Sequence, residues 1–116
     1  MSDPSPWISA KQFQEFWVKN ANGAYKDTGK QILDNPEIAW NAPVNQGDVV
    51  QLAKINSDES VGEAFHSMYI SGYVHDGTND TYGLTYHTNN TNNTLFKSLI
   101  EVCRSYPNEY ILFYTF

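Results

Sequence analysis

The chain has 116 residues, the length of a single domain, and we expect residues 1–116 to form one domain in which residues 1–7 are flexible. A hydrophobic fraction of 41% and a charged fraction of 17% exclude an intrinsically disordered chain. The formal net charge of −6, with only seven scattered Lys and Arg residues, argues against binding to nucleic-acid phosphates and favours a basic partner.

Cysteine content and the lack of apolar segments predict a location. Cys103 is the only cysteine, so no disulfide can form within the chain. The opening residues MSDPSPW lack the basic and apolar regions of a secretory signal, and no stretch reaches the ~18 apolar residues of a membrane helix. We therefore expect a cytoplasmic protein that does not bind membranes. Three glycosylation sequons are then incidental to polar loops: Asn79, Asn89 and Asn92.

The first predicted helix covers residues 10–21. Ser9 is expected as its N-cap, with Gln12 as the reciprocal partner in a capping box. Gly23 suits the left-handed position that ends a helix. Three aromatic residues share one helical face: Phe13, Phe16 and Trp17.

Residues 24–47 show no clear periodicity, and no change in composition marks a domain boundary there. The segment DTGKQILDNP is compatible with a helical turn that ends before Pro36, and EIAW is compatible with a short strand. The next segment, DVVQLAKIN, is rich in β-branched residues and predicts a strand.

The segment 65–88 predicts a β-hairpin, because two Tyr-rich runs flank the turn sequence HDGTND. A two-residue Asp-Gly turn would give a rival register. A loop at Asp76–Asn79 instead aligns three pairs across the strands: Tyr73 with Tyr82, Tyr69 with Tyr86, and Gly72 with Gly83. The glycine pair would leave a bare patch that a helix or ligand can approach.

The C-terminal third predicts a helix followed by a strand. Asn93 or Thr94 is expected to cap a helix with a wide apolar stripe, which SYPNE ends. YILFYTF is apolar on both faces, as is typical of a central strand. The predicted fold is α+β: a mainly antiparallel sheet, an N-terminal helix, and a second helix before a central C-terminal strand. One core is expected, built from Phe13, Phe16, Trp17, Leu99, Leu112 and Tyr114.

A pocket around two histidines is the first candidate site. In the predicted hairpin, His66 and His87 point to the same sheet face, with His87 opposite Met68. Gly72 and Gly83 would lie nearby. Because no third His or Cys is placed with them, we expect no bound metal and no cofactor.

Other chemical residues have structural interpretations. His75 and Asp76 adjoin a turn, which explains them without catalysis. Cys103 lies on the apolar face near the C-terminus of its helix, so we expect core packing rather than a nucleophile. No phosphate-binding loop or calcium motif is present in the sequence.

Tyrosines and carboxylates provide the second candidate site, a protein-binding surface. Its predicted residues are Asp58, Glu59, Glu63, Tyr73, Asp76, Asp80 and Tyr82. The sequence therefore favours a non-enzymatic protein-binding module, such as a small acidic inhibitor or immunity-type protein that neutralises a basic nuclease or toxin. The alternatives are a small ligand-binding domain or enzyme that uses the histidine pocket, and a self-associating structural subunit.

Overall fold

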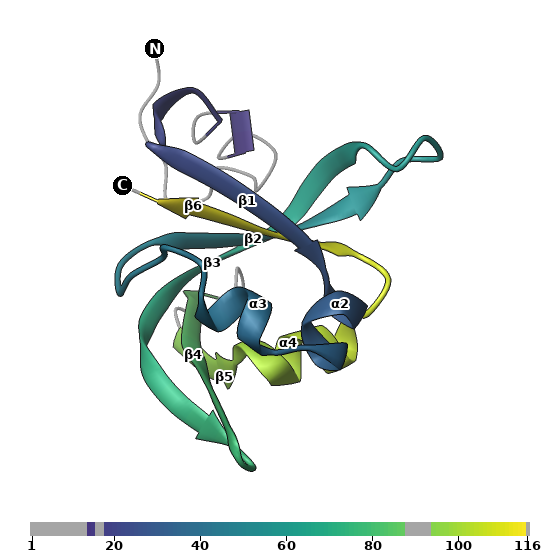
Figure 1. The fold of residues 1–116 in the computed structure, drawn as a ribbon. Helices are drawn as coiled ribbons and strands as arrows, with labels where there is room; N and C mark the ends of the chain where they lie inside the picture. The colour runs from purple at the N-terminus through teal and green to yellow at the C-terminus, as the bar shows by residue number, and fades with distance from the viewer. Residues whose placement is uncertain (1–13, 16–17, 88–93, 116) are drawn as a thin grey trace.

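The computed structural model describes residues 14–15, 18–87 and 94–115, which form one six-stranded antiparallel sheet with short helices (Figure 1). The strand order is β1-β6-β2-β3-β4-β5. The strands are β1 Gly23–Thr28, β2 Val49–Ile55, β3 Val61–Asp76, β4 Asn79–His87, β5 Thr94–Ser98 and β6 Tyr110–Thr115. The helices are α2 Gly29–Asp34, α3 Glu37–Trp40 and α4 Leu99–Ser105. This architecture confirms the predicted α+β fold with a mainly antiparallel sheet.

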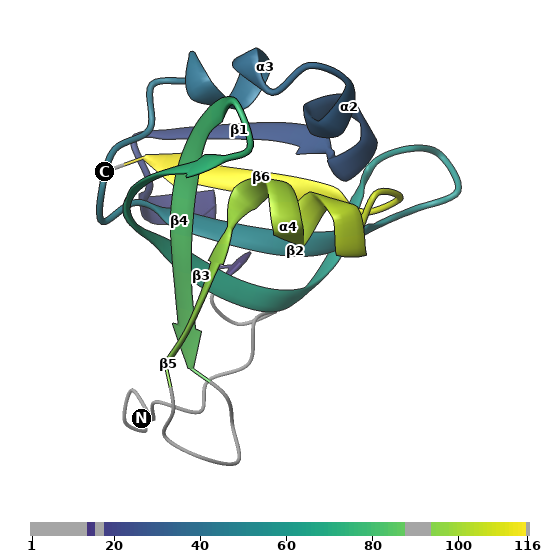
Figure 2. The same ribbon diagram turned by 90° about the horizontal axis from the view of Figure 1, so that it is seen from below.

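The sheet curls around α2, α3 and α4 (Figure 1), and β4 runs across the direction of β6 (Figure 2). β6 lies between β1 and β2, which confirms its predicted central position. Ile111 and Phe113 are fully buried in a cluster that includes Leu99 of α4. A second cluster contains Ala53, Ala64, Tyr110, Leu112 and Tyr114. The predicted single core is therefore wrong, because alternate residues of β6 enter two apolar layers.

The predicted N-terminal helix lies mostly outside the described residues, but 14–15 and 18–20 are helical where described. Gln14 fastens this segment to β3: its amide donates to the Gly62 carbonyl at 3.0 Å and accepts from the Ala64 N–H at 2.9 Å. Gly23 begins β1 instead of ending the helix, so that prediction is wrong. The other predicted capping and packing residues lie outside the described ranges: Ser9, Gln12, Phe13, Phe16 and Trp17.

Two predicted elements have a different type in the structure. EIAW is helix α3 rather than a strand, and it follows Pro36, whose φ of −58° is already helical. Residues Thr94–Ser98, expected to begin a helix, form β5 because they pair with the edge of β4. The helix α4 starts only after Ser98, whose hydroxyl accepts from the Glu101 N–H at 3.1 Å while the Glu101 carboxylate accepts from the Ser98 N–H at 3.2 Å.

The β3–β4 hairpin has the predicted register near its tip. Tyr73 pairs with Tyr82 and Gly72 with Gly83. The turn is made by Gly77 and Thr78, and Gly77 supplies the positive φ of 64°.

Further from the tip the predicted register is wrong. Ser71 is an extra residue in β3, so Tyr69 lies opposite Thr85 rather than Tyr86. The Ser71 hydroxyl donates to the Gly83 carbonyl at 3.2 Å. This β-bulge moves every earlier residue of β3 by one position relative to β4.

Candidate functional site

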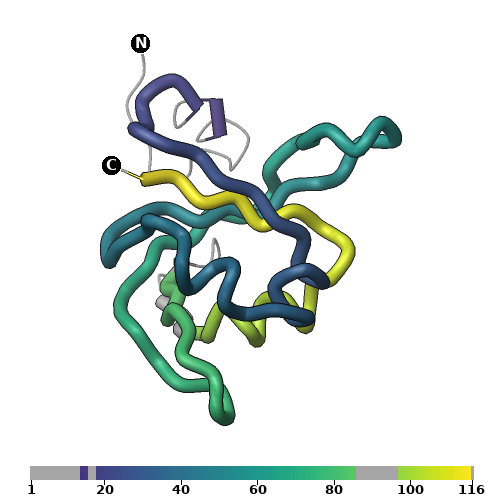
Figure 3. Tube along the Cα trace, in the orientation of Figure 1, coloured from purple at the N-terminus to yellow at the C-terminus, as the bar shows by residue number. Residues whose placement is uncertain are grey.

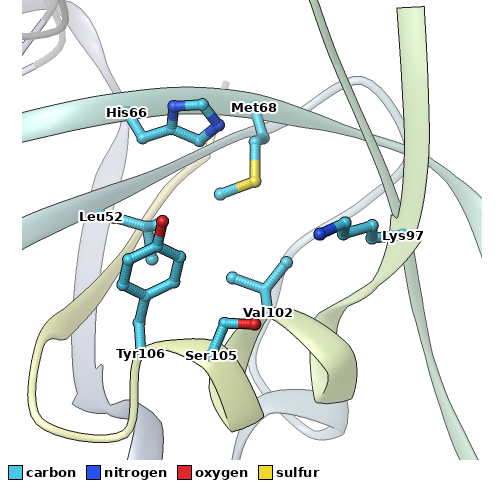
Figure 4. A pocket seen from close by; sticks show the side chains of 7 residues that line it. All are labelled: Leu52, His66, Met68, Lys97, Val102, Ser105 and Tyr106. Carbon is cyan, nitrogen blue, oxygen red and sulfur yellow. The ribbon is translucent and has the colours of Figure 1, made fainter.

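A pocket of about 160 Å³ lies where β2, β3 and β5 meet α4 (Figure 4). Its apolar lining is supplied by Leu52, Met68 and Val102. Its polar groups come from His66, Lys97, Ser105 and Tyr106. An apolar cavity of about 150 Å³ can hold a molecule as large as benzene, so this pocket has room for one small chemical group.

A second β-bulge turns His66 toward this pocket. His66 pairs with Leu52, whereas the next residue of β2, Ala53, pairs with Ala64, so Phe65 is the extra residue. Ala64 belongs to the cluster on one face of the sheet, and Met68 belongs to the cluster under the helices. With regular alternation, residues 64, 66 and 68 would all share one face. The bulge reverses the alternation, and His66 lies with Met68 on the helix side.

Phe65 is directed to the same neighbourhood as His66. Its ring contacts the ring of Tyr106, which also lines the pocket, with 5.7 Å between centroids. Two consecutive strand residues therefore approach one residue at the end of α4, as a bulge permits.

The polar groups of the pocket are one basic amine, from Lys97, and three groups that carry no negative charge, from His66, Ser105 and Tyr106. Burial, and then the nearby charge of Lys97, hold the pKa of His66 below its ordinary value. The imidazole is consequently uncharged at neutral pH and can both accept and donate a hydrogen bond. No carboxylate is present among the described residues that line the pocket. In Figure 4 the imidazole and the Lys97 amine reach into the pocket from different strands, with Ser105 and Tyr106 on the helix side.

Of the other predicted pocket residues, Gly72 and Gly83 are absent from the described lining, and the side chain of His87 lies outside the described part of the structure. His87 pairs with Thr94 in the backbone of β4 and β5. The predicted alignment of His87 with Met68 is wrong, because the extra residue Ser71 shifts the register. Gly72 and Gly83 pair with each other but do not line the pocket, and no atom lies within 4 Å of a Cβ placed on Gly72. No described helix therefore approaches Gly72 closely, whereas Gly83 is buried.

Sequence reasoning missed Lys97, Ser105 and Tyr106 as pocket residues. Ser105 and Tyr106 lie in the segment SYPNE, which is informative only as the end of a helix. The sequence predicts a helix at Lys97, but the residue is part of β5. Its position beside His66 depends on the pairing of β5 with β4, for which the local sequence contains no signal.

Cys103 is fully buried, which confirms its predicted place in the core. Burial, and then the charge of Asp27, raise the pKa of its thiol to about 12. The thiolate is therefore negligible at neutral pH, and Cys103 is unsuited to be a nucleophile.

The predicted protein-binding residues are divided between the two ends of β3, which Figure 3 shows as separate hairpin tips. Asp58, Glu59 and Glu63 lie at or near the β2–β3 turn and are exposed. At the other end, Tyr73 is exposed, and the exposed Asp80 contacts Nδ1 of His75 at 2.7 Å. The two groups therefore lie toward opposite ends of a 16-residue strand.

Tyr82 is too deeply buried to contact a partner protein, so its predicted role in binding is wrong. Its side chain is 2% exposed, and its hydroxyl donates to the carbonyls of Ala39 at 3.1 Å and Trp40 at 3.2 Å. Trp40, which sequence reasoning did not select, is 37% exposed and packs against both Tyr73 and Tyr82.

The described part of the chain contains no group of three or more His, Cys, Asp or Glu side chains that could hold a metal ion. No helix in these residues is long and apolar enough to cross a bilayer.

No curated protein and no solved structure matches the chain. A family model described as "putative amidase domain" matches residues 1–114. Because this match covers nearly the whole length, the chain belongs to the "putative amidase domain" family.

Proposed function

We propose that the pocket beside His66 binds a small amide-bearing ligand. The observation that carries this proposal is the inward-facing, uncharged imidazole in a pocket of about 160 Å³. The family match supports an amide as the ligand class. The proposal corresponds to the small-ligand alternative from the sequence, with a different set of neighbours around His66.

The chemistry of the pocket suits an amide, which has both a hydrogen-bond acceptor and a donor. The Lys97 amine can donate to the amide oxygen, and the neutral imidazole of His66 can accept from the amide N–H. The hydroxyls of Ser105 and Tyr106 can take either role. The apolar residues around them exclude water and strengthen these contacts.

Binding is proposed rather than hydrolysis. A neutral imidazole is the form that can take up a proton, but hydrolysis also needs an activated nucleophile within its reach. The Cys103 thiol, with a pKa of about 12, is not one, and binding requires only that the polar groups of His66, Lys97, Ser105 and Tyr106 line the pocket.

The test is a titration with N-acetylglycinamide, followed by the NMR signals of the histidine side chains. His66 should shift while His75, whose side chain is 78% exposed, should not. Methyl acetoxyacetate, in which esters replace both amides so that no N–H remains, should bind at least about tenfold more weakly. The variant His66→Gln should lose binding, and the matched control His75→Gln should retain it. Equal affinity for the ester, or equal effects of the two variants, would contradict the proposal.

A second candidate function is the binding of a basic protein partner, as for an inhibitor or immunity-type protein. The observation that favours it is the 54% exposure of Tyr73 beside the exposed Trp40. Copurification from the native host tests it: a stoichiometric basic partner supports it, and a homo-oligomer alone supports the self-association alternative. The cytoplasmic location and the absence of a metal or cofactor stay predictions from the sequence.

A further inference from the structure

Three aromatic rings form a cluster where α3 meets the β3–β4 hairpin. The ring of Trp40 lies 5.3 Å from that of Tyr82 and 5.7 Å from that of Tyr73, and the two tyrosine rings are 5.8 Å apart. Tyr82 is buried, whereas Trp40 and Tyr73 are 37% and 54% exposed. The cluster therefore has a buried base and an accessible outer layer.

The cluster is fixed in place before any partner binds. The Tyr82 hydroxyl donates to two backbone carbonyls of α3, at Ala39 and Trp40, which joins the helix to β4. Trp40 and Tyr73 meet edge to face with an interplanar angle of 85°. Rigid aromatic rings lose little conformational entropy on binding, which is why Trp and Tyr are common among the residues that dominate interfaces.

The segments that carry the exposed rings have no Lys or Arg of their own. In the sequence, none occurs between Lys30 and Lys54 or between Lys54 and Lys97. These two intervals contain α3 and the whole β3–β4 hairpin. Arg104 of α4 reaches the hairpin, but its guanidinium binds the carboxylate of Asp76.

Carboxylates supply negative charge near the rings. Glu37 is exposed and precedes Trp40 by three residues in α3, so the two side chains are neighbours on the helix surface. Burial, the neighbouring Tyr73 and the charge of Asp48 together raise the pKa of Tyr82. Burial is the largest of these causes, and the two carboxylates that supply negative charge near the cluster are Glu37 and Asp48.

We propose that Trp40, Tyr73 and Glu37 form a docking surface for an arginine- or lysine-bearing segment of a partner protein. A guanidinium or ammonium group would lie on an exposed ring face, where the ring quadrupole attracts it, and Glu37 would supply the opposite charge. This inference rests on the second function proposed above, protein binding, and is independent of the His66 pocket. It replaces the surface predicted from the sequence, since Tyr82 is buried and Asp58, Glu59 and Glu63 lie toward the other end of β3.

The probe is a synthetic peptide of alternating glycine and arginine with three arginines. Its control has citrulline at each arginine, which keeps the planar group and removes the charge. The arginine peptide should bind at least about tenfold more tightly than the citrulline peptide. Its affinity should fall between about 50 mM and 500 mM salt, because the attraction between charges is screened.

The variants Tyr73→Ser and Glu37→Gln test the location. Tyr73→Ser should weaken binding of the arginine peptide about tenfold, and Glu37→Gln about threefold. The matched controls are Tyr25→Ser on β1, where Tyr25 is 41% exposed, and Glu109→Gln in the turn before β6. Both controls should change affinity less than about twofold, because they lie outside the docking surface.

Three outcomes would overturn the inference. If the citrulline peptide binds equally well, the surface does not recognise positive charge. If the arginine peptide binds but Tyr73→Ser and Tyr25→Ser have the same effect, the location is wrong while protein binding by this chain survives. If the arginine peptide does not bind at all, the inference and the proposed binding of a basic partner both fail.

Discussion

The carboxylate of Asp76 at the hairpin tip accepts hydrogen bonds from both terminal nitrogens of Arg104, at 3.1 and 2.9 Å. The Ser98 hydroxyl, which also caps α4, donates to the same carboxylate at 3.0 Å. One side chain therefore joins the β3–β4 hairpin to the start and the end of the last helix.

The first prediction concerns the acid stability that this contact confers. Hydrogen bonds from Arg104 and Ser98 hold the pKa of Asp76 below its ordinary value. A carboxyl with a lowered folded pKa stabilises the protein above its unfolded pKa of about 3.9, and this contribution is lost as pH falls through the folded value. Asp76→Asn should lower the melting temperature at neutral pH, and its difference from wild type should shrink in acid. Thermal melts across this pH range measure it, with the exposed Asp34→Asn as the control. A difference that is independent of pH would refute the role of this charge.

The second prediction concerns the titration of His66. Its pKa should lie below about 6.5 in an NMR titration, because burial and then Lys97 disfavour the charged form. Lys97→Met should raise this pKa, whereas Lys54→Met on β2 should leave it unchanged. The unfolded chain binds this proton more readily, so His66 should reduce stability as pH falls through the unfolded pKa toward the folded one. A pKa that is insensitive to Lys97→Met would contradict the described pocket.

The third prediction concerns the two apolar layers. Leu99→Ala and Leu112→Ala should each lower the free energy of unfolding by about 2–5 kcal/mol, since 1% and 6% of their side chains are exposed. Urea denaturation measures the loss, with Val18→Ala, which is 67% exposed, expected within about 0.5 kcal/mol of wild type. Losses below about 1 kcal/mol at both leucines would contradict the core assignment.

The fourth prediction compares two glycines. A Cβ on Gly29 would lie 2.3 Å from the Tyr106 carbonyl oxygen and 2.9 Å from the Pro107 Cα, both backbone atoms. Gly29→Ala should therefore separate α2 from the chain after α4 and destabilise the protein by about 1–3 kcal/mol. Gly72→Ala, with no atom within 4 Å of the new Cβ, should change stability by less than about 0.5 kcal/mol. Thermal melts of the two variants measure this contrast, and equal effects would argue against the close packing at Gly29.

Local sequence determined the elements whose partners are close in the chain. The turn sequence HDGTND set the pairing of Tyr73 with Tyr82, because Gly77 permits the positive φ that a tight hairpin needs. The unbroken apolar run of β6 likewise predicted a central strand, since a strand covered on both faces needs apolar residues at every position. The burial of Cys103 followed from the apolar stripe of its helix.

Tertiary structure decided what depends on distant pairing. Thr94–Ser98 became a strand only because the edge of β4 was available to it. The extra residues Phe65 and Ser71 determined which face His66 takes and which residue lies opposite Tyr69. Periodicity along one strand cannot reveal a bulge, because a bulge is a mismatch in length between two paired strands. The sequence by itself therefore determined β2, β6 and the tight turn of the β3–β4 hairpin, whereas the contacts between strands determined β5 and the neighbours of His66 and Tyr69.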